Sequence, residues 1–403
     1  MTLIVSARER LNESALFLYF GVAVLCLASR TPDVKHNLNV NNGTYGVLIS
    51  LGAIGAVIAF MFVGQLTHRF GVGRLLVVTG TLTFGSIALI PHIHTAWIFV
   101  AANILVAAGF NSYNIALHHQ ALKRQLLSGE KNLPRLHGAW SLGTLLTTLI
   151  SIAVTSRVSL TWHVDVLMAI LWFGTMTSIF AMRPFLIEGS TKYTDAEIVR
   201  LRDTWSMLTK DRYIAIAYVC AVMVEFSSND WVTLSSHQEI KASTTLSIVP
   251  YLTFIVGMTI GRLGIHKLFV RKPEIYWIRV ASRVGGSGFI IFLLLAKFFS
   301  SRNFGVAFTC EILGFFLGGI CGSFFAGVLT QFASQRSTFP AGVVVAQIGL
   351  AIAVLTFTVK IVISWVVQVT SITYGLMIPG AMMIAFSLFK KLEPQEALHS
   401  LAP

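Results

Sequence analysis

Charged residues are scarce in this 403-residue chain. Asp, Glu, Lys and Arg together make up 12% of it, about half of the roughly 25% that soluble domains carry. Hydrophobic residues make up 55% of the 403 residues, or about 222. Twelve membrane-spanning helices of about 20 residues each need a similar number, ~240. This composition excludes a soluble globular protein, a disordered chain and a collagen-like fibre. We expect an all-α polytopic membrane protein.

Other absences exclude further classes of protein. No nucleotide-binding loop G-x-x-x-x-G-K-[ST] occurs, so the energy for any transport comes from a gradient unless a partner subunit supplies it. No cluster of His, Asp or Ser has metal or nucleophile spacing, so we expect no metal, no cofactor and no enzyme. The four cysteines lie inside apolar runs and are interpreted as core residues. They are Cys26, Cys220, Cys310 and Cys321.

Twelve apolar runs are long enough to cross a bilayer. Six lie near residues 14–29, 44–66, 75–90, 96–117, 137–156 and 164–182. Six more lie near residues 213–234, 245–264, 284–299, 304–330, 341–359 and 365–389. The runs predict an N-terminal six-helix bundle over residues 1–186, a polar cytoplasmic linker over 187–211 and a C-terminal six-helix bundle over 212–403.

The positions of the basic residues test this topology. The net charge is +13, yet no basic domain or aromatic–basic interleaving points to nucleic acid. If the N-terminus is cytoplasmic and the runs alternate, 23 of the 30 Lys and Arg residues lie on the cytoplasmic side. Cytoplasmic loops of membrane proteins collect such residues. We therefore expect twelve transmembrane helices with both termini in the cytoplasm.

A glycine-rich basic stretch follows the second run. Residues 64–74 read GQLTHRFGVGR and resemble the G-x-x-x-D-R-x-G-R-R loop of the major facilitator superfamily, with His68 in place of the Asp. Residues 67–70 are also weakly similar to residues 265–268. The two stretches follow the second and the eighth runs, which are equivalent spans in a six-plus-six duplication. Small residues let helix ends approach closely, and arginines can bond terminal carbonyls or a carboxylate.

Further stretches are similar to the fucose-permease-like bacterial branch of this superfamily. They are residues 28–32 with 43–46, 136–143, 225–231 and 261–262. The resemblance implies two pseudo-symmetric six-helix bundles that rock around a central site lined by spans 1, 4, 7 and 10. It also implies a conformational-gating loop made of Gly64, His68, Arg69, Gly71 and Arg74. The fifth span lacks the G-P-x-G-G pattern of many drug/proton antiporters, which disfavours that activity.

Two carboxylates lie inside spans, where charged groups are costly and usually face a cavity or a partner. Glu225 is in the seventh run and Glu311 in the tenth, and alternation of the runs predicts nearly equal depths for them. A carboxylate shielded from water holds a proton more readily. The hypothesis is that Glu225 couples transport to protons with Glu311 as helper. The alternative is a hydrogen-bonded Glu that joins helices.

Polar residues near Glu225 are candidates for contact with the substrate. Asn229 lies one helical turn beyond it on the same face, and Asn suits hydroxyl groups. Trp231 offers a flat ring to a solute, or else anchors the helix at the membrane interface. Asp230 is interpreted as a solvated helix end or a partner for Arg30.

The fourth run carries Asn111, Asn114 and His118 on one face. These residues contact a substrate or bond another helix. In fucose permease the coupling carboxylates lie in spans 1 and 4. Here the fourth run has no acidic residue and the first has only Glu13 at its cytoplasmic edge, so that route of proton coupling is disfavoured.

Three more residues complete the candidate substrate site. His137 and Trp140 open the fifth run, where a histidine can relay protons or serve as a structural hydrogen-bonding group. Arg30, at the outer mouth of the first run, can bind an anionic substrate, a lipid headgroup or a loop.

The sequence thus predicts a secondary active transporter in the plasma (inner) membrane, a monomer that crosses the lipid bilayer many times. Its expected partners are a small polar solute, a sugar-like metabolite being favoured, and protons. The alternative function is export of metabolites or hydrophobic drugs by the same fold.

Overall fold

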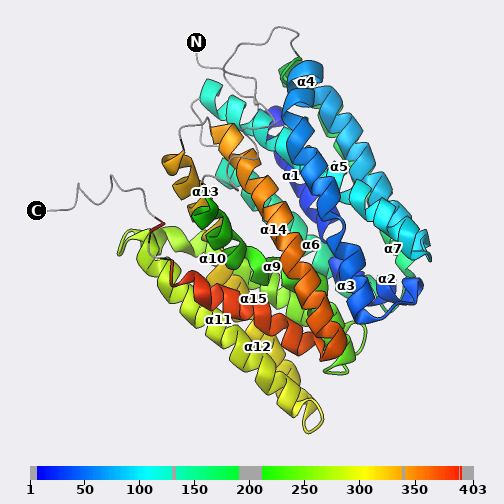
Figure 1. Ribbon diagram of the computed structural model, residues 1–403. Helices are drawn as coiled ribbons and strands as arrows, with labels where there is room; N and C mark the ends of the chain where they lie inside the picture. Colours follow the sequence, from blue (N-terminus) through cyan, green and yellow to red (C-terminus); the bar gives the residue numbers. More distant parts are fainter. Residues whose placement is uncertain (1–6, 129–132, 190–210, 338–340, 390, 393–403) are drawn as a thin grey trace, which may run out of the picture. The chain divides into compact units, whose positions relative to one another are not determined.

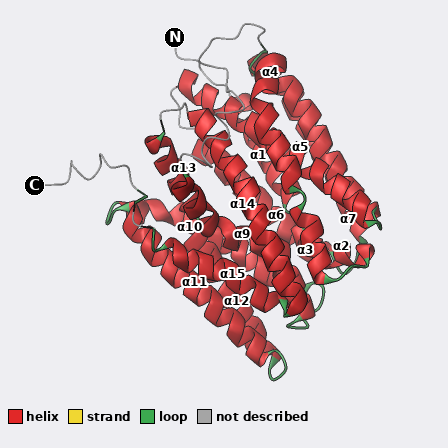
Figure 2. Cartoon of the chain, in the orientation of Figure 1, coloured by secondary structure: helices red, strands yellow, loops and turns green. Residues whose placement is uncertain are grey.

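The computed structural model describes residues 7–128, 133–189, 211–337, 341–389 and 391–392 (Figure 1). Throughout these ranges the regular structure is helical, and Figure 2 draws no strand in them. The chain divides into two compact units. Unit 1 comprises Met1–Val40 and Leu48–Leu201, and unit 2 comprises Asn41–Val47 and Arg202–Pro403.

Unit 1 is built from long helices joined by short turns. Its helices are α1 (Ala7–Val24), α2 (Thr31–Leu38), α4 (Ala53–Leu89), α5 (Ala96–Ser128), α6 (Leu133–Val154) and α7 (Leu160–Met182). Single 3-10 turns occupy Ala28–Arg30, Ile90–His92 and Arg183–Phe185. Helices α4 and α5 pack side by side, as do α1 and α6 (Figure 1).

Unit 2 contains most of the second half of the chain. Its helices are α9 (Arg212–Gln238), α10 (Val249–Phe269), α11 (Glu274–Phe299), α12 (Phe304–Gly322), α13 (Phe325–Arg336), α14 (Ala341–Val369) and α15 (Ile372–Phe386), with a 3-10 turn at Leu246–Ile248. The first residues of α3 (Asn42–Ser50) also belong to it. Helix α12 packs against α10 and α11.

Local chemistry sets the helix ends. Ser159 accepts a hydrogen bond from the Trp162 amide at the start of α7, and Asp211 accepts one from Ile214 at the start of α9. Such side chains satisfy amide groups that the first helical turn leaves unpaired. Inside a bilayer only the helix itself can pair the backbone of a single segment, so apolar runs of this length form helices.

Glycines set the spacing between packed helices. A Cβ atom on Gly21 would overlap the carbonyl oxygen of Trp140, and one on Gly143 would overlap that of Leu18. A Cβ on Gly257 would lie 2.7 Å from the carbonyl oxygen of Phe316. The pairs α1–α6 and α10–α12 therefore pack backbone against backbone, as small residues allow in membranes.

Nine helical stretches among the described residues are long and apolar enough to cross a membrane. This confirms a polytopic helical fold. Several run boundaries are wrong, two of them in unit 2. Helix α14 continues through Lys360 to Val369, and the Lys360 ammonium is paired with Asp230 at 2.7 Å. The tenth run is divided at Ser323–Phe324 into α12 and α13.

Candidate functional site

Glu225 lies at the midpoint of α9, 13 residues from either end. Its Oε1 atom is 3.4 Å from an Nη2 nitrogen of Arg262 on α10. The two side chains are 27% and 33% exposed, so the pair is reachable from outside the helix packing. Arg262 also donates through Nε to the carbonyl oxygen of Ser323, at 3.2 Å. One guanidinium therefore links Glu225 to the end of α12.

Glu311 occupies a different level of unit 2. It is 1% exposed on α12, and its Oε1 accepts a hydrogen bond from the Ser235 hydroxyl at 3.0 Å. Ser235 is ten residues beyond Glu225 on α9, or about 15 Å along the helix axis. The prediction of nearly equal depths is wrong, because α9 continues to Gln238, four residues beyond the end of the apolar run.

The polar residues that follow Glu225 have partners within unit 2. Asn229 accepts a hydrogen bond from the Tyr251 hydroxyl at 3.0 Å. The Trp231 side chain is 2% exposed and packs edge-on against Tyr45, with ring centroids 6.4 Å apart. The pairing of Asp230 with Lys360 takes the place of the expected pairing with Arg30.

The docked segment, Asn41–Val47, reaches this part of unit 2. Its Asn42 donates to Gln238 at 3.0 Å, and the Gly43 amide donates to Gln368 at 2.9 Å. A Cβ on Gly46 would overlap the Ser364 hydroxyl. Sequence reasoning missed these contacts because they join positions about 200 and 300 residues apart.

In unit 1 the amide stripe of α5 is partly buried. Asn111 donates to the carbonyl oxygen of Ala107 at 2.8 Å, and Nδ1 of His118 contacts the Asn114 carbonyl oxygen at 2.9 Å. Both bonds stay within α5. Among the described residues, Asn111 makes no hydrogen bond to another helix.

A ring cluster joins α1, α5 and α6. The centroids of His118 and His137 are 5.2 Å apart, and the Phe17 ring lies 5.3 Å from His118. His137 is exposed and Trp140 is partly exposed on the same helix. The structure thus brings His137 beside the amide stripe of α5.

Arg30 is buried, with 2% of its side chain exposed. Its Nε is 2.7 Å from an oxygen of Asp33, and Nη1 contacts Thr155 and the carbonyl oxygen of Val158 at 3.4 Å. Nη1 also lies 3.5 Å from Nδ1 of His163. These contacts favour the loop-bonding alternative over an anion site.

Sequence reasoning missed a cluster of charges in unit 1. Nη2 of Arg124 on α5 lies 2.9 Å from Glu9, and its Nη1 lies 3.2 Å from Glu13. Arg135 on α6 lies 3.4 Å from the same Glu13 oxygen. The signal was the four-residue spacing of the two acids, which puts them on one face of a helix.

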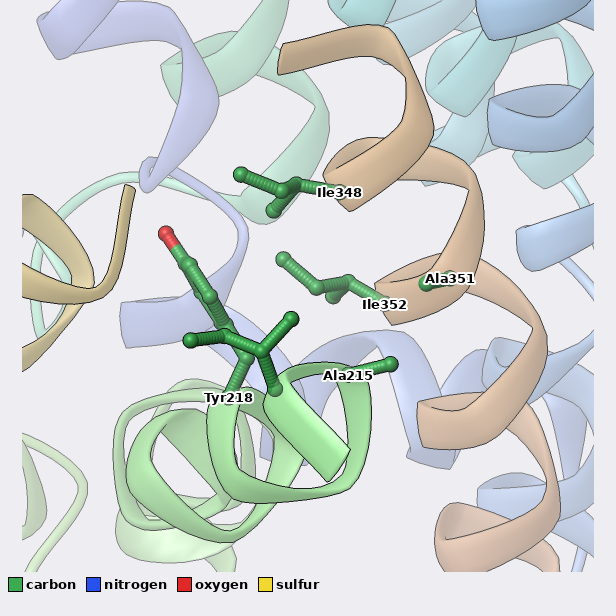
Figure 3. Close-up of a pocket in the computed structure, with 6 residues that line it drawn as sticks. Ala215, Tyr218, Ile348, Ala351 and Ile352 are labelled. Carbon is green, nitrogen blue, oxygen red and sulfur yellow. The ribbon is translucent and has the colours of Figure 1, made fainter. Parts of the chain in front are cut away.

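Two crevices in the described residues are apolar. One lies between α9 and α14, where Tyr218 faces Ile348 and Ile352 (Figure 3). The other, of about 210 Å³, is lined by Val24, Leu27, Ile87, Val106, Ala107 and Phe110. Neither is lined by a candidate polar residue.

Comparison with known proteins settles the family. The sequence model of the Major Facilitator Superfamily matches residues 14–310. The chain is a member of this superfamily. It is 22% identical over 352 residues to an uncharacterised MFS-type transporter of Yersinia pestis, covering 84% of each chain. These findings confirm the resemblance to the superfamily, and they make the chain a transporter and not an enzyme.

Solved structures share the fold of this superfamily member. The nucleoside transporter NupG superposes with a TM-score of 0.73 at 13% identity, over 95% of this chain and 98% of that one. A D-xylose–proton symporter gives 0.69 at 15% identity, over 96% and 98%. As a member of the superfamily, the chain is a multi-pass integral protein of the bacterial plasma membrane that binds a small-molecule substrate.

The loop that resembles the superfamily motif is folded around Gly71. This residue has φ 79° and ψ 159° inside α4 and divides it into two helical legs. A Cβ there would lie 2.7 Å from the Gly189 nitrogen and 2.9 Å from the Ile187 carbonyl oxygen. That oxygen accepts a hydrogen bond from the Val72 amide at 2.9 Å. The loop thus holds the chain that follows α7.

The other motif residues are less constrained. A Cβ on Gly64 would meet nothing within 4 Å. Arg69 and Arg74 are exposed, and within the described ranges neither has an ion pair with a carboxylate. The Arg69 guanidinium lies over the Phe70 ring, 5.3 Å from its centroid. His68 is partly buried. The sequence analysis placed Gly71 in this loop, but it did not predict the close approach of Gly71 to Gly189.

A glutamine completes this attachment, and sequence reasoning missed it. The Gln120 side chain on α5 donates to the Phe185 carbonyl oxygen at 3.0 Å and accepts from the Ile187 amide at 3.1 Å. A side-chain amide can make both bonds because it carries a donor and an acceptor. Most of the predicted linker, residues 190–210, lies outside the described residues.

Proposed function

We propose that this transporter moves a small polar solute, a sugar-like metabolite, by alternating access, and that protons drive it through Glu225. The proposal includes twelve transmembrane helices with both termini in the cytoplasm, two six-helix bundles over residues 1–186 and 212–403, and a monomeric chain. The loop with Gly64, His68, Arg69, Gly71 and Arg74 acts in conformational gating.

The helix inventory supports twelve spans. One of the nine apolar stretches, Asn42–His92, contains both legs of α4, which Gly71 separates. Helix α9 has 27 residues and carries Glu225 and Asp230, so its length suffices although its composition is more polar. Helix α15, with 15 residues, reaches about 22 Å and is the shortest of these spans.

The partly exposed ion pair at the middle of α9 carries the proposal. Glu225 lies about 20 Å from either end of its helix, a depth at which charged groups face a partner or water rather than lipid. Its partner Arg262 holds it by one 3.4 Å contact. A proton on Glu225 would remove the ion pair and so weaken this link between α9 and α10, while Arg262 keeps its hydrogen bond to Ser323.

Glu311 fits the role of helper. It is buried, and one of its oxygens accepts a hydrogen bond from Ser235. A carboxyl group in that setting retains a proton at little cost. It connects α12 to α9 in either state.

The nature of the solute is inferred from the polar side chains. Asn111, Asn114, His137, Trp140 and Asn229 present amide, imidazole and indole groups, which suit hydroxyl-rich rings. Two structural neighbours carry names that specify a nucleoside and D-xylose, solutes rich in hydroxyl groups. We leave Arg30 and Trp231 as weaker members of the set, because both side chains are buried.

The test begins with a thermal-shift screen of the purified protein against sugars, nucleosides, amino acids and organic anions. The solute found is then used in proteoliposomes. Glu225→Gln should abolish uphill uptake driven by a proton gradient and leave solute exchange intact, whereas Asp165→Asn, at an exposed carboxylate of α7, should change neither. Unchanged uphill uptake by Glu225→Gln would reject the coupling role. Transport of apolar solutes outward only would favour the exporter.

A further inference from the structure

The turn between α10 and α11 carries a cluster of basic side chains, here called the basic turn. Five Lys and Arg residues lie within 17 positions of the chain, and a single acid, Glu274, lies among them. Four of the five are exposed and one is partly buried. Within the described ranges none of them has an ion pair with a carboxylate. The five are Lys267, Arg271, Lys272, Arg279 and Arg283.

The basic residues at the opposite end of α11 have partners within the protein. The Lys297 ammonium lies 3.2 Å from a carboxylate oxygen of Glu239. The Arg302 guanidinium donates to the Phe298 carbonyl oxygen at 2.6 Å and lies 3.9 Å from the centroid of the Phe298 ring. Cations that are close together and lack a carboxylate repel one another. The basic turn therefore gains if an anion from outside the chain lies among its side chains.

Exposed apolar and aromatic side chains accompany these charges. Val270, in the turn itself, is 88% exposed, and Leu263 on α10 is 66% exposed. The Tyr276 side chain is 47% exposed and packs edge-on against Trp277, with ring centroids 5.2 Å apart. Such aromatic rings are enriched at the level of the lipid headgroups. A surface that combines cations with exposed apolar side chains suits a ligand that has both a charged group and an apolar part.

Hydrogen bonds fix the shape of the basic turn. The Leu268 carbonyl oxygen at the end of α10 accepts from the indole nitrogen of Trp277 at 2.9 Å and from the Arg271 amide at 2.9 Å. The first turns of α11 are thereby attached to the end of α10. Three turns into α11, the Arg283 Nε donates to the Ser387 hydroxyl at 3.3 Å. That bond leaves the two Nη groups of Arg283 available to a ligand.

We propose that the basic turn, residues 267–283, binds the headgroup of an anionic phospholipid. Clusters of about four to eight Lys and Arg residues beside a membrane helix attract anionic lipids. The exposed Val270 and Tyr276 favour a lipid over free phosphate, which would contact the cations alone. Cytoplasmic retention of basic residues explains their side of the membrane but requires neither the missing carboxylates nor the apolar neighbours. The inference rests on the proposed topology only for the leaflet, which is the cytoplasmic one.

The test is thermal unfolding of the full chain in a neutral detergent during titration with phosphatidylglycerol. The lipid should raise the Tm, and high salt should reduce the rise, whereas phosphatidylcholine with the same acyl chains and inorganic phosphate should not raise it. Arg271→Gln combined with Lys272→Gln should increase the lipid concentration at half-maximal shift about 30-fold. The matched control, Arg157→Gln combined with Arg302→Gln, removes two exposed charges elsewhere and should leave that concentration unchanged.

A charge-conserving variant separates loss of binding from misfolding. Arg271→Lys combined with Lys272→Arg keeps both charges and should bind phosphatidylglycerol as wild type does. The inference is overturned if phosphatidylcholine or inorganic phosphate raises the Tm as much as phosphatidylglycerol, or if the two glutamine variants need the same lipid concentration. Stabilisation by phosphatidylglycerol without proton-driven uptake would reject the proposed function alone. Uptake that needs Glu225, in a protein that phosphatidylglycerol does not stabilise, would reject this inference alone.

Discussion

Replacing Gly71 with alanine should destabilise unit 1, whereas the same change at Gly64 should not. Both glycines belong to one motif and lie in α4, seven residues apart. Gly71 has φ 79° and ψ 159°, a region that is essentially restricted to glycine. Gly64 has open space around it.

The magnitude follows from two terms. Holding alanine in that backbone conformation costs about 1–3 kcal/mol. Its Cβ would also press on the Gly189 nitrogen and the Ile187 carbonyl oxygen, which endangers the Val72–Ile187 hydrogen bond and costs about 1 kcal/mol more. At Gly64, alanine should stabilise an exposed helical position by up to about 1 kcal/mol.

The assay is thermal unfolding of the purified protein in detergent. A loss of about 3 kcal/mol should lower the Tm by roughly 6–12 °C for a unit of about 200 residues. Gly64→Ala should leave the Tm unchanged or slightly raised. An equal Tm for the two variants would refute the reasoning, since it would mean that α4 does not require glycine at the positive-φ position 71.

Two further substitutions test contacts of unit 2. Gly46→Val should cost about 1–3 kcal/mol through overpacking against Ser364 and Trp231, and should raise amide hydrogen exchange in the docked segment; unchanged exchange would contradict that packing. Glu239→Gln should cost about 2 kcal/mol, because Glu239 accepts hydrogen bonds from the Ile372 amide at 2.7 Å and from the amide of the next residue at 3.2 Å. Faster amide hydrogen exchange at the start of α15 in Glu239→Gln would show this loss. Equal exchange in wild type and variant would contradict a stabilising role of the Glu239 hydrogen bonds.

Hydropathy predicted the bounds of a helix well where the helix ends together with its apolar run. The run at 164–182 ends with α7 at Met182. The run at 96–117 starts with α5, but the helix continues to Ser128, since a helix can extend into water while an apolar run cannot. The sequence placed Glu13 at the edge of the first apolar run. Helix α1 begins six residues earlier, at Ala7, because its first turns are polar.

The polar sites were harder to predict, because their geometry depends on neighbours distant in the chain. The sequence points to Glu225 as an unusual charge, but the distance to Arg262 requires the α9–α10 packing. Lys360 seemed to mark a loop, and only its pairing with Asp230 explains why a helix runs through it. For Arg30, sequence alone did not decide between an anion site and the contacts with Asp33 and Val158.

The docked segment has a consequence for work on isolated halves. Because Asn41–Val47 covers Trp231 and bonds Gln238 and Gln368, a fragment that starts at Arg212 would lack a segment that packs on its own helices. A fragment cut at the linker would expose the indole ring of Trp231 and leave Gln238 and Gln368 without these hydrogen-bond partners. A faithful reconstitution of the carboxyl-terminal bundle would have to supply this peptide in trans.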